Sequence, residues 1–119
     1  MKKFVNEVDN ILSESLIGFG KAHSDIINVN LSPDFISRRN KSNKDKVALI
    51  SGGGSGHEPL HGGFVGYGML DAACPGQVFS APTPDQMEAA SNEVHNNKGI
   101  LFIVKNYSGD IMNFEMSAD

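Results

Sequence analysis

A short apolar segment that leads into a run of glycines constrains this chain more than any other part of its sequence. Residues 47–51 read as a short buried strand, and four glycines follow between positions 52 and 56. Glycine lets the backbone approach a ligand closely and direct several N–H groups at it. In α/β proteins, ligands bind where a strand ends in such a loop. The loop of residues 52–58 is therefore expected to belong to a binding site.

A second apolar segment, residues 100–104, has the continuous hydrophobicity of a parallel strand covered on both faces. A helix predicted over residues 83–97 separates it from the strand at 47–51. If the two strands are parallel, their exit loops lie at the same edge of the sheet. We therefore expect residues 52–58 and residues 105–110 to meet there, in an α/β fold with a mostly parallel or mixed sheet flanked by helices.

The N-terminal region predicts an amphipathic helix that ends at Gly18 and Gly20. Its apolar residues recur at steps of three and four: Phe4, Val8, Ile11, Leu12, Leu16 and Phe19. Short strands are possible around residues 26–27 and 35–36. Residues 59–70 carry too many glycines for a long helix and are expected to form turns.

The remaining elements follow from turn and capping signals. Residues 71–74 and 77–80 read as two short extended pieces around Pro75-Gly76. The helix at 83–97 has Thr83 as its N-cap, Pro84 in the first helical position and Gln86 completing a capping box. Its inner face is expected to carry Met87, Ala90 and Val94, with Gly99 as the C-terminal stop. A further helix is expected to begin at Ile111.

Composition narrows the class of protein. The 119 residues suit one small domain or part of a larger one, and 39% hydrophobic and 20% charged residues are ordinary for a globular protein. A net charge of −4 argues weakly against a nucleic-acid partner. The basic residues cluster in one segment, which we interpret as a solvated loop: Arg38, Arg39, Lys41, Lys44 and Lys46.

Cysteine usage and hydropathy indicate the cellular compartment in which the protein is expected. Cys74 is the only cysteine, so an internal disulfide and a cysteine-based zinc site are excluded. The N-terminus lacks the apolar core of a signal peptide, and no apolar run is long enough to cross a bilayer. We expect a cytoplasmic protein that does not bind a membrane.

The two loops would bring together backbone N–H groups, His57, Lys105 and Asp110. A histidine and an aspartate that face a polyol or a carbonyl compound can act as acid and base. Structural alternatives exist for each group. The glycines could make a tight turn, His57 could pack against the core, Asp110 could cap the last helix, and Lys105 could be solvated.

Several familiar motifs fail at specific residues. His57 and His61 match the zinc-protease pattern H-E-x-x-H, but Pro59 lies between them and prevents the required helix, so no metal is expected. A phosphate-binding loop would end in Gly-Lys-Ser or Gly-Lys-Thr, whereas this run ends in Ser-Gly-His. The serine-hydrolase elbow would need glycine at position 57, and no dinucleotide-binding pattern of glycines is complete.

Four separated sequence blocks resemble the dihydroxyacetone kinase family, in its N-terminal substrate-binding part. The blocks are Ser51-Gly-Gly-Gly-Ser-Gly-His-Glu-Pro59, Gly68-Met-Leu70, Ala81-Pro-Thr-Pro-Asp-Gln86, and Lys105-Asn-Tyr-Ser-Gly-Asp110 with Asn113-Phe-Glu115. The resemblance covers nearly all of the chain.

The resemblance implies an enzyme that phosphorylates dihydroxyacetone. It implies that the substrate is held by Gly54, Ser55, Gly56, His57, Lys105 and Asp110. Asp110 resembles the general base that takes the proton from the reacting hydroxyl, and His57 resembles its acid/base partner. The family also holds the substrate carbonyl on a histidine far downstream, and no histidine of this chain matches that position. We therefore expect residues 1–119 to be an incomplete N-terminal domain that is inactive alone.

The family offers two phosphoryl donors, ATP or a nucleotide-carrying subunit recharged by the phosphotransferase system. The short chain without a nucleotide loop favours the second type, with no cofactor bound by this chain, a nucleotide-binding kinase subunit as partner, and a homodimer when complete. The alternative is a non-catalytic coactivator that binds dihydroxyacetone and signals to a transcription regulator.

Overall fold

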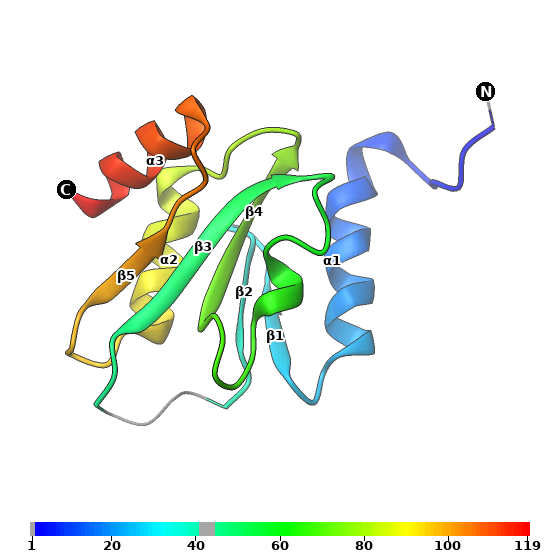
Figure 1. Cartoon of the computed structure of the whole chain (residues 1–119). Helices are drawn as coiled ribbons and strands as arrows, with labels where there is room; N and C mark the ends of the chain where they lie inside the picture. Colours follow the sequence, from blue (N-terminus) through cyan, green and yellow to red (C-terminus); the bar gives the residue numbers. More distant parts are fainter. Residues whose placement is uncertain (1, 41–44) are drawn as a thin grey trace.

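The structure is built on a mixed five-stranded sheet with the strand order β1-β2-β4-β3-β5 (Figure 1). The computed structural model describes residues 2–40 and 45–119. The strands are β1 (Ile27–Asn30), β2 (Phe35–Arg38), β3 (Ala48–Ser55), β4 (Ala72–Val78) and β5 (Ile100–Ile103). β3 runs parallel to β4 and β5, whereas β1, β2 and β4 pair antiparallel. The predicted α/β class and the parallel strand pair are both confirmed.

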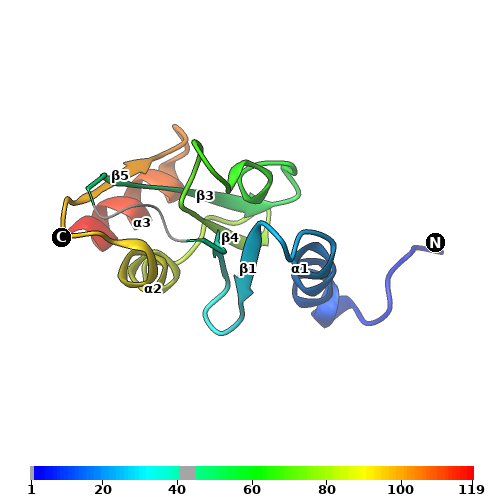
Figure 2. The same cartoon turned by 90° about the horizontal axis from the view of Figure 1, so that it is seen from below.

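Helices cover both faces of this sheet (Figure 2). They are α1 (Ile11–Ala22), α2 (Pro84–Val94) and α3 (Ser108–Ala118), with 3-10 turns η1 (Val8–Asn10) and η2 (Gly62–Phe64). Successive residues of a strand point to opposite faces, so the strands supply two apolar layers. No helix in the described part of the chain is long and apolar enough to span a bilayer.

The two layers divide along β4. Ala72 and Cys74 join the layer beneath α2 and α3, whose centre includes Ile50, Met87 and Phe114. Ala73 faces the other way, into a layer that α1 and the segment after β3 close. Burial raises the pKa of the Cys74 thiol to about 12, so this cysteine stays protonated inside the first layer.

The N-terminal helix differs from its prediction at both ends. It begins only at Ile11, and the side chains of Phe4 and Val8 are exposed. Gly20 lies inside the helix and does not end it. A Cβ on Gly20 would lie 2.9 Å from Cγ2 of Val29, so this glycine lets α1 approach β1 closely.

β3 is longer than predicted because the glycine run continues the strand. Gly52, Gly53 and Gly54 pair with β4, and the chain turns only after Ser55. A Cβ on Gly52 would lie 2.6 Å from the carbonyl oxygen of Cys74, so the glycines permit close packing. The expectation of a loop over residues 52–58 is therefore wrong for its first four residues.

β4 is one continuous strand, where two short pieces around Pro75 were predicted. A proline is tolerated because β2 pairs with β4 only at Ala72 and Ala73 and leaves that side of Pro75 without a strand. The side chain of Gln86 occupies the place of a strand partner on that side. Its Nε2 donates to the carbonyl of Pro75 at 2.6 Å and to that of Asp34 at 2.7 Å.

The start of α2 is confirmed in detail. Thr83 is the N-cap, Pro84 follows it, and Gln86 completes the capping box. Met87, Ala90 and Val94 are buried, as expected. The helix ends at Val94 rather than near Gly99, which instead adopts φ +93° in the turn before β5.

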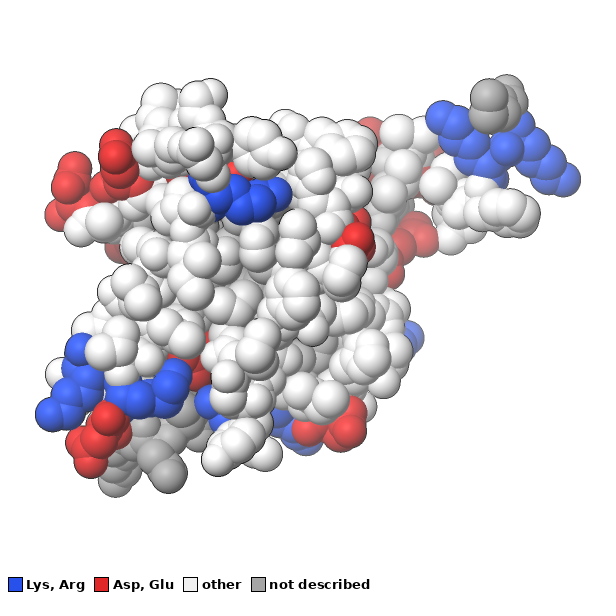
Figure 3. Space-filling model, in the orientation of Figure 1, with Lys and Arg blue, Asp and Glu red and all other residues white. Residues whose placement is uncertain are grey.

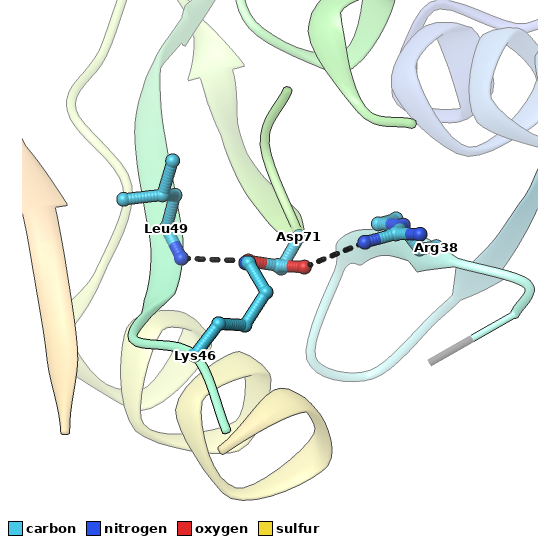
Figure 4. Close-up of polar contacts among 4 residues, drawn as sticks. All are labelled: Arg38, Lys46, Leu49 and Asp71. Carbon is cyan, nitrogen blue, oxygen red and sulfur yellow. Dashed lines mark hydrogen bonds and ion pairs between the residues drawn. The ribbon is translucent and has the colours of Figure 1, made fainter. Parts of the chain in front are cut away.

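The basic segment before β3 is more than a solvated loop. Asp71, almost fully buried, accepts hydrogen bonds from Lys46 Nζ, from Arg38 Nη1 at 3.2 Å and from the Leu49 N–H at 2.8 Å (Figure 4). Burial alone would raise the pKa of the Asp71 carboxyl, but these partners together hold it below its usual value. The rest of the basic segment is outside this cluster: Arg39 donates to the carbonyl of Ser24, and Lys41 and Lys44 lie outside the described residues.

Charged side chains on the face shown in Figure 3 occur in small separate groups of both signs. Most of that face is uncharged. In β5, the apolar side chains of Leu101 and Ile103 are half-exposed.

Candidate functional site

A pocket of about 420 Å³ lies where β3, β4 and β5 end and α3 begins. β5 pairs with β3 only as far as Ser51, so the last residues of β3 have no strand on that side. The segments after β4 and β5 lie at the same edge of the sheet (Figure 1), and both contribute residues to the lining. The pocket is lined by Gly54, His57, Phe79, Ser80, Ala81, Lys105, Tyr107, Gly109 and Asp110.

Asp110 supplies a carboxylate in the first turn of α3, where the helix dipole favours a negative charge. Its side chain is 3% exposed, and its Oδ1 has no hydrogen-bond partner within residues 2–40 and 45–119. A buried polar atom left unpaired costs about 1–3 kcal/mol, so Oδ1 is prepared to bind a ligand group. The alternative of Asp110 as the helix cap is wrong, because Tyr107 holds the N-cap position.

His57 lies between two aromatic rings. Its ring stacks on Tyr107, with the centroids 6.5 Å apart, and meets Phe79 edge-on at 5.1 Å. These contacts fix the plane of the imidazole. His57 therefore lines the pocket and does not belong to either apolar layer of the core.

Lys105 extends from the end of β5 across the surface of β3. Its Nζ lies 5.3 Å from the ring centroid of Tyr107, within range of a cation–π interaction. A Cβ on Gly53 would lie 2.8 Å from Cε and 2.9 Å from Nζ of Lys105. The absence of a side chain at Gly53 thus makes room for the lysine.

The residues predicted from the glycine run divide into two groups. Gly54 lines the pocket, and a Cβ there would lie 2.7 Å from the backbone nitrogen of Ser80. Ser55 is buried and its Oγ donates to the carbonyl of Gly76 at 2.8 Å. The Gly56 N–H donates to the carboxylate of Glu58 at 2.9 Å. Ser55 and Gly56 therefore support the turn and do not line the pocket.

Sequence reasoning missed five lining residues: Phe79, Ser80, Ala81, Tyr107 and Gly109. The signal was available, because β4 ends at the same edge of the sheet as β3 and β5. Treating residues 71–80 as one strand would have placed residues 79–81 there. Residues 57–61 form turns rather than a helix, and the described residues contain no group of three potential metal ligands.

Comparison with known proteins assigns the family. A model of the Dak1 domain matches residues 17–119. The chain belongs to the Dak1 domain family. This Dak1 chain is 46% identical over 119 residues to the dihydroxyacetone-binding subunit DhaK of the PEP-dependent dihydroxyacetone kinase of Escherichia coli (strain K12). That match covers all of this chain and 33% of the E. coli protein.

Other relatives show the same relation. The corresponding subunit of the PTS-dependent kinase of Lactococcus lactis is 48% identical, over 99% of this Dak1 chain and 35% of its own length. The chain spans about a third of the length of these curated relatives.

Solved structures agree with the fold of the Dak1 chain. The dihydroxyacetone kinase of C. freundii, in complex with AMP-PNP and Mg²⁺, matches with a TM-score of 0.90 at 41% identity, over 98% of this chain and 22% of that one. The dihydroxyacetone kinase operon co-activator Dha-DhaQ matches with a TM-score of 0.80 at 34% identity, over 95% and 33%.

Proposed function

We propose that this chain is the N-terminal portion of a dihydroxyacetone kinase subunit and that its pocket binds dihydroxyacetone for phosphorylation to dihydroxyacetone phosphate. The observation that carries the proposal is the buried carboxylate of Asp110, with Oδ1 unpaired among the described residues, in one pocket with His57 and Lys105. The names of the similar DhaK subunits support it.

Each group has a distinct role in this proposal. Asp110 accepts the proton of the hydroxyl group as its oxygen attacks the phosphorus atom. His57 hydrogen-bonds to the substrate and acts as its acid/base partner. Lys105 and the backbone at Gly54 hold the substrate oxygens, with Ser55 and Gly56 shaping the turn beside them. A histidine outside residues 1–119 would hold the carbonyl covalently.

The phosphoryl donor in this proposal is a nucleotide-carrying partner subunit, and this chain binds no cofactor. The sequence has no Gly-Lys-Ser or Gly-Lys-Thr that could cradle phosphates. Several similar subunits are named as parts of PEP-dependent or PTS-dependent kinases. The complete protein would act in the cytoplasm as a homodimer.

A coactivator is the second candidate, and the match to Dha-DhaQ favours it specifically. Such a protein would bind dihydroxyacetone and contact a transcription regulator without transferring phosphate. The presence of both His57 and Asp110 in one pocket favours the kinase, because a binding protein has no need of a base.

One experiment separates the two candidates. The full-length protein is assayed for dihydroxyacetone phosphate formation with the nucleotide-carrying subunit and the phosphotransferase components. The kinase proposal expects turnover that depends on this subunit. Binding of dihydroxyacetone without turnover, together with association with a transcription regulator, would establish the coactivator instead.

A further inference from the structure

His61 lies directly behind the pocket and has no role in the function proposed so far. It follows the turns after β3 and occupies the N-cap position of η2. On its other side is a mostly apolar cavity of about 390 Å³, whose lining includes Leu16, Phe19 and Ile36. The ring of His61 thus stands between this cavity and the end of β3.

His61 and Lys105 share one small space above Gly53. A Cβ on Gly53 would lie 2.9 Å from Nζ of Lys105 and 3.2 Å from Cε1 of His61. The ammonium group and this edge of the imidazole are therefore both within 3.2 Å of a single point. Only a glycine at this position lets the two side chains approach each other.

The polar atom next to that edge is unpaired. Nδ1 of His61 is buried and has no hydrogen-bond partner in the part of the chain that the structure describes. Nδ1 is bonded to Cε1, the atom that faces Gly53. The ammonium group of Lys105 likewise makes no hydrogen bond or ion pair with a described residue, and it lies over the ring of Tyr107. An unpaired nitrogen of His61 and the ammonium group of Lys105 thus both border the small space above Gly53.

The surroundings of His61 keep its imidazole neutral. Burial lowers the pKa of His61, the charge of Lys105 lowers it further, and His57 acts in the same direction. The carboxylate of Asp110 acts to raise this pKa, but its effect is smaller than the sum of the others. A neutral imidazole with its proton on Nε2 leaves a lone pair on Nδ1, so it can accept a hydrogen bond from an ammonium group.

We propose that His61 is a positioning residue of the substrate site, whose Nδ1 accepts a hydrogen bond from Nζ of Lys105 and directs that ammonium group at the bound substrate. The inference rests on the proposed function and deepens it. Hydrogen bonds of catalytic groups are often long in the empty site and tighten when substrate binds. His61 acts only through Lys105 and touches no reacting atom.

The test uses the full-length protein with its phosphoryl donor and two substitutions of opposite character. His61→Phe keeps a ring but removes both nitrogens, whereas His61→Asn keeps an acceptor near the position of Nδ1. A hydrogen bond to a charged group is worth enough to raise KM for dihydroxyacetone about tenfold or more in His61→Phe. His61→Asn is expected to restore most of that loss. His95→Phe, the same change at an exposed histidine, serves as the matched control.

A double-mutant cycle with Lys105→Met isolates the pair. If His61 acts through Lys105, His61→Phe adds little in the Lys105→Met background. An effect of equal size in both backgrounds would overturn the proposal, as would an unchanged KM in His61→Phe.

A spectroscopic measurement keeps the proposal testable if a variant fails to fold or the enzyme is inactive. In protein labelled with ¹⁵N-histidine, the Nδ1 signal of His61 is expected to shift on addition of dihydroxyacetone and to lose this response in Lys105→Met. If the Nδ1 signal of His61 responded to dihydroxyacetone equally in the wild type and in Lys105→Met, the proposed contact would be refuted. Absence of turnover in the wild-type protein would refute the proposed function and leave this measurement to decide on the contact.

Discussion

The rings of His57 and Tyr107 lie nearly parallel across the mouth of the pocket, 6.5 Å apart with an interplanar angle of 15°. One ring follows β3 and the other follows β5, so the stack joins the two segments that form the site. The same tyrosine lies under the ammonium group of Lys105. Tyr107 thus holds two of the proposed substrate-binding groups at once.

Replacing Tyr107 by leucine is expected to weaken substrate binding more than it weakens the fold. Aromatic contacts of this kind contribute about 0.5–1.5 kcal/mol each, so KM for dihydroxyacetone should rise roughly three- to tenfold. Tyr107 is more than half exposed, and its loss leaves the core intact. Steady-state kinetics of the full-length protein measure the effect. Tyr107→Phe retains both ring contacts, and an equally large rise in KM there would contradict this explanation.

Asp110→Asn should abolish phosphoryl transfer and leave dihydroxyacetone binding largely intact. The amide keeps the size and one oxygen of the side chain but cannot accept the proton. We expect kcat to fall by at least about a hundredfold, measured beside the dissociation constant from calorimetry. Near-normal turnover would show that Asp110 is not the base.

Gly53→Ala is expected to damage the site without unfolding the protein. The new Cβ meets the far end of the flexible Lys105 side chain and the edge of His61, not the backbone. Lys105 can move aside, so the melting temperature should change little while KM rises.

Gly18→Ala is the matched control for this change, because a Cβ there meets nothing within 4 Å on α1. Removing a glycine from a helix should stabilise it by up to about 1 kcal/mol and leave KM unaltered. A melting temperature for Gly53→Ala far below that of the wild type would show that the clash is not relieved by Lys105.

Asp71 should make the stability of the protein depend on pH in the acid range. The pKa of its carboxyl is lower in the folded state than in the unfolded chain, so its stabilisation is complete above the unfolded value. It is lost as the pH falls through the lower folded value. Asp71→Asn leaves Lys46 and Arg38 without their partner and should cost about 3 kcal/mol at neutral pH. The melting temperatures of the two forms should begin to converge below about pH 4 and should meet only below the lowered pKa of the folded Asp71 carboxyl.

The sequence predicted those features that local chemistry determines. The capping box at Thr83 and Gln86 and the convergence of His57, Lys105 and Asp110 followed from capping rules and strand order alone. The extension of β3 through Gly52–Ser55 could not be predicted in this way, because glycine favours turns unless neighbouring atoms occupy the space where a side chain would lie. That space belongs to Cys74 and Lys105, which are distant in sequence.

Long-range partners explain the other errors as well. Gly20 lies inside α1 because the helix packs closely on Val29, a contact that no local pattern encodes. β4 continues through Pro75 because β2 ends before reaching it, and the side chain of Gln86 donates a hydrogen bond to the carbonyl of Pro75 instead. The pairing of Asp71 with Arg38 and Lys46 spans 33 and 25 residues, so the basic segment looked merely solvated in the sequence.

The glycines at the end of β3, Gly52 to Gly54, limit how such a protein could change its substrate during evolution. Any side chain at Gly52 or Gly54 would collide with backbone atoms of a neighbouring segment, so Gly54, the lining residue that β3 supplies, cannot acquire new chemistry by a single substitution. Apart from His57, which follows β3, the other lining residues lie within residues 79–81 and 105–110, which belong to two separate connections. New specificities in this fold should therefore arise by exchange of those two connections while the strand beneath them stays the same.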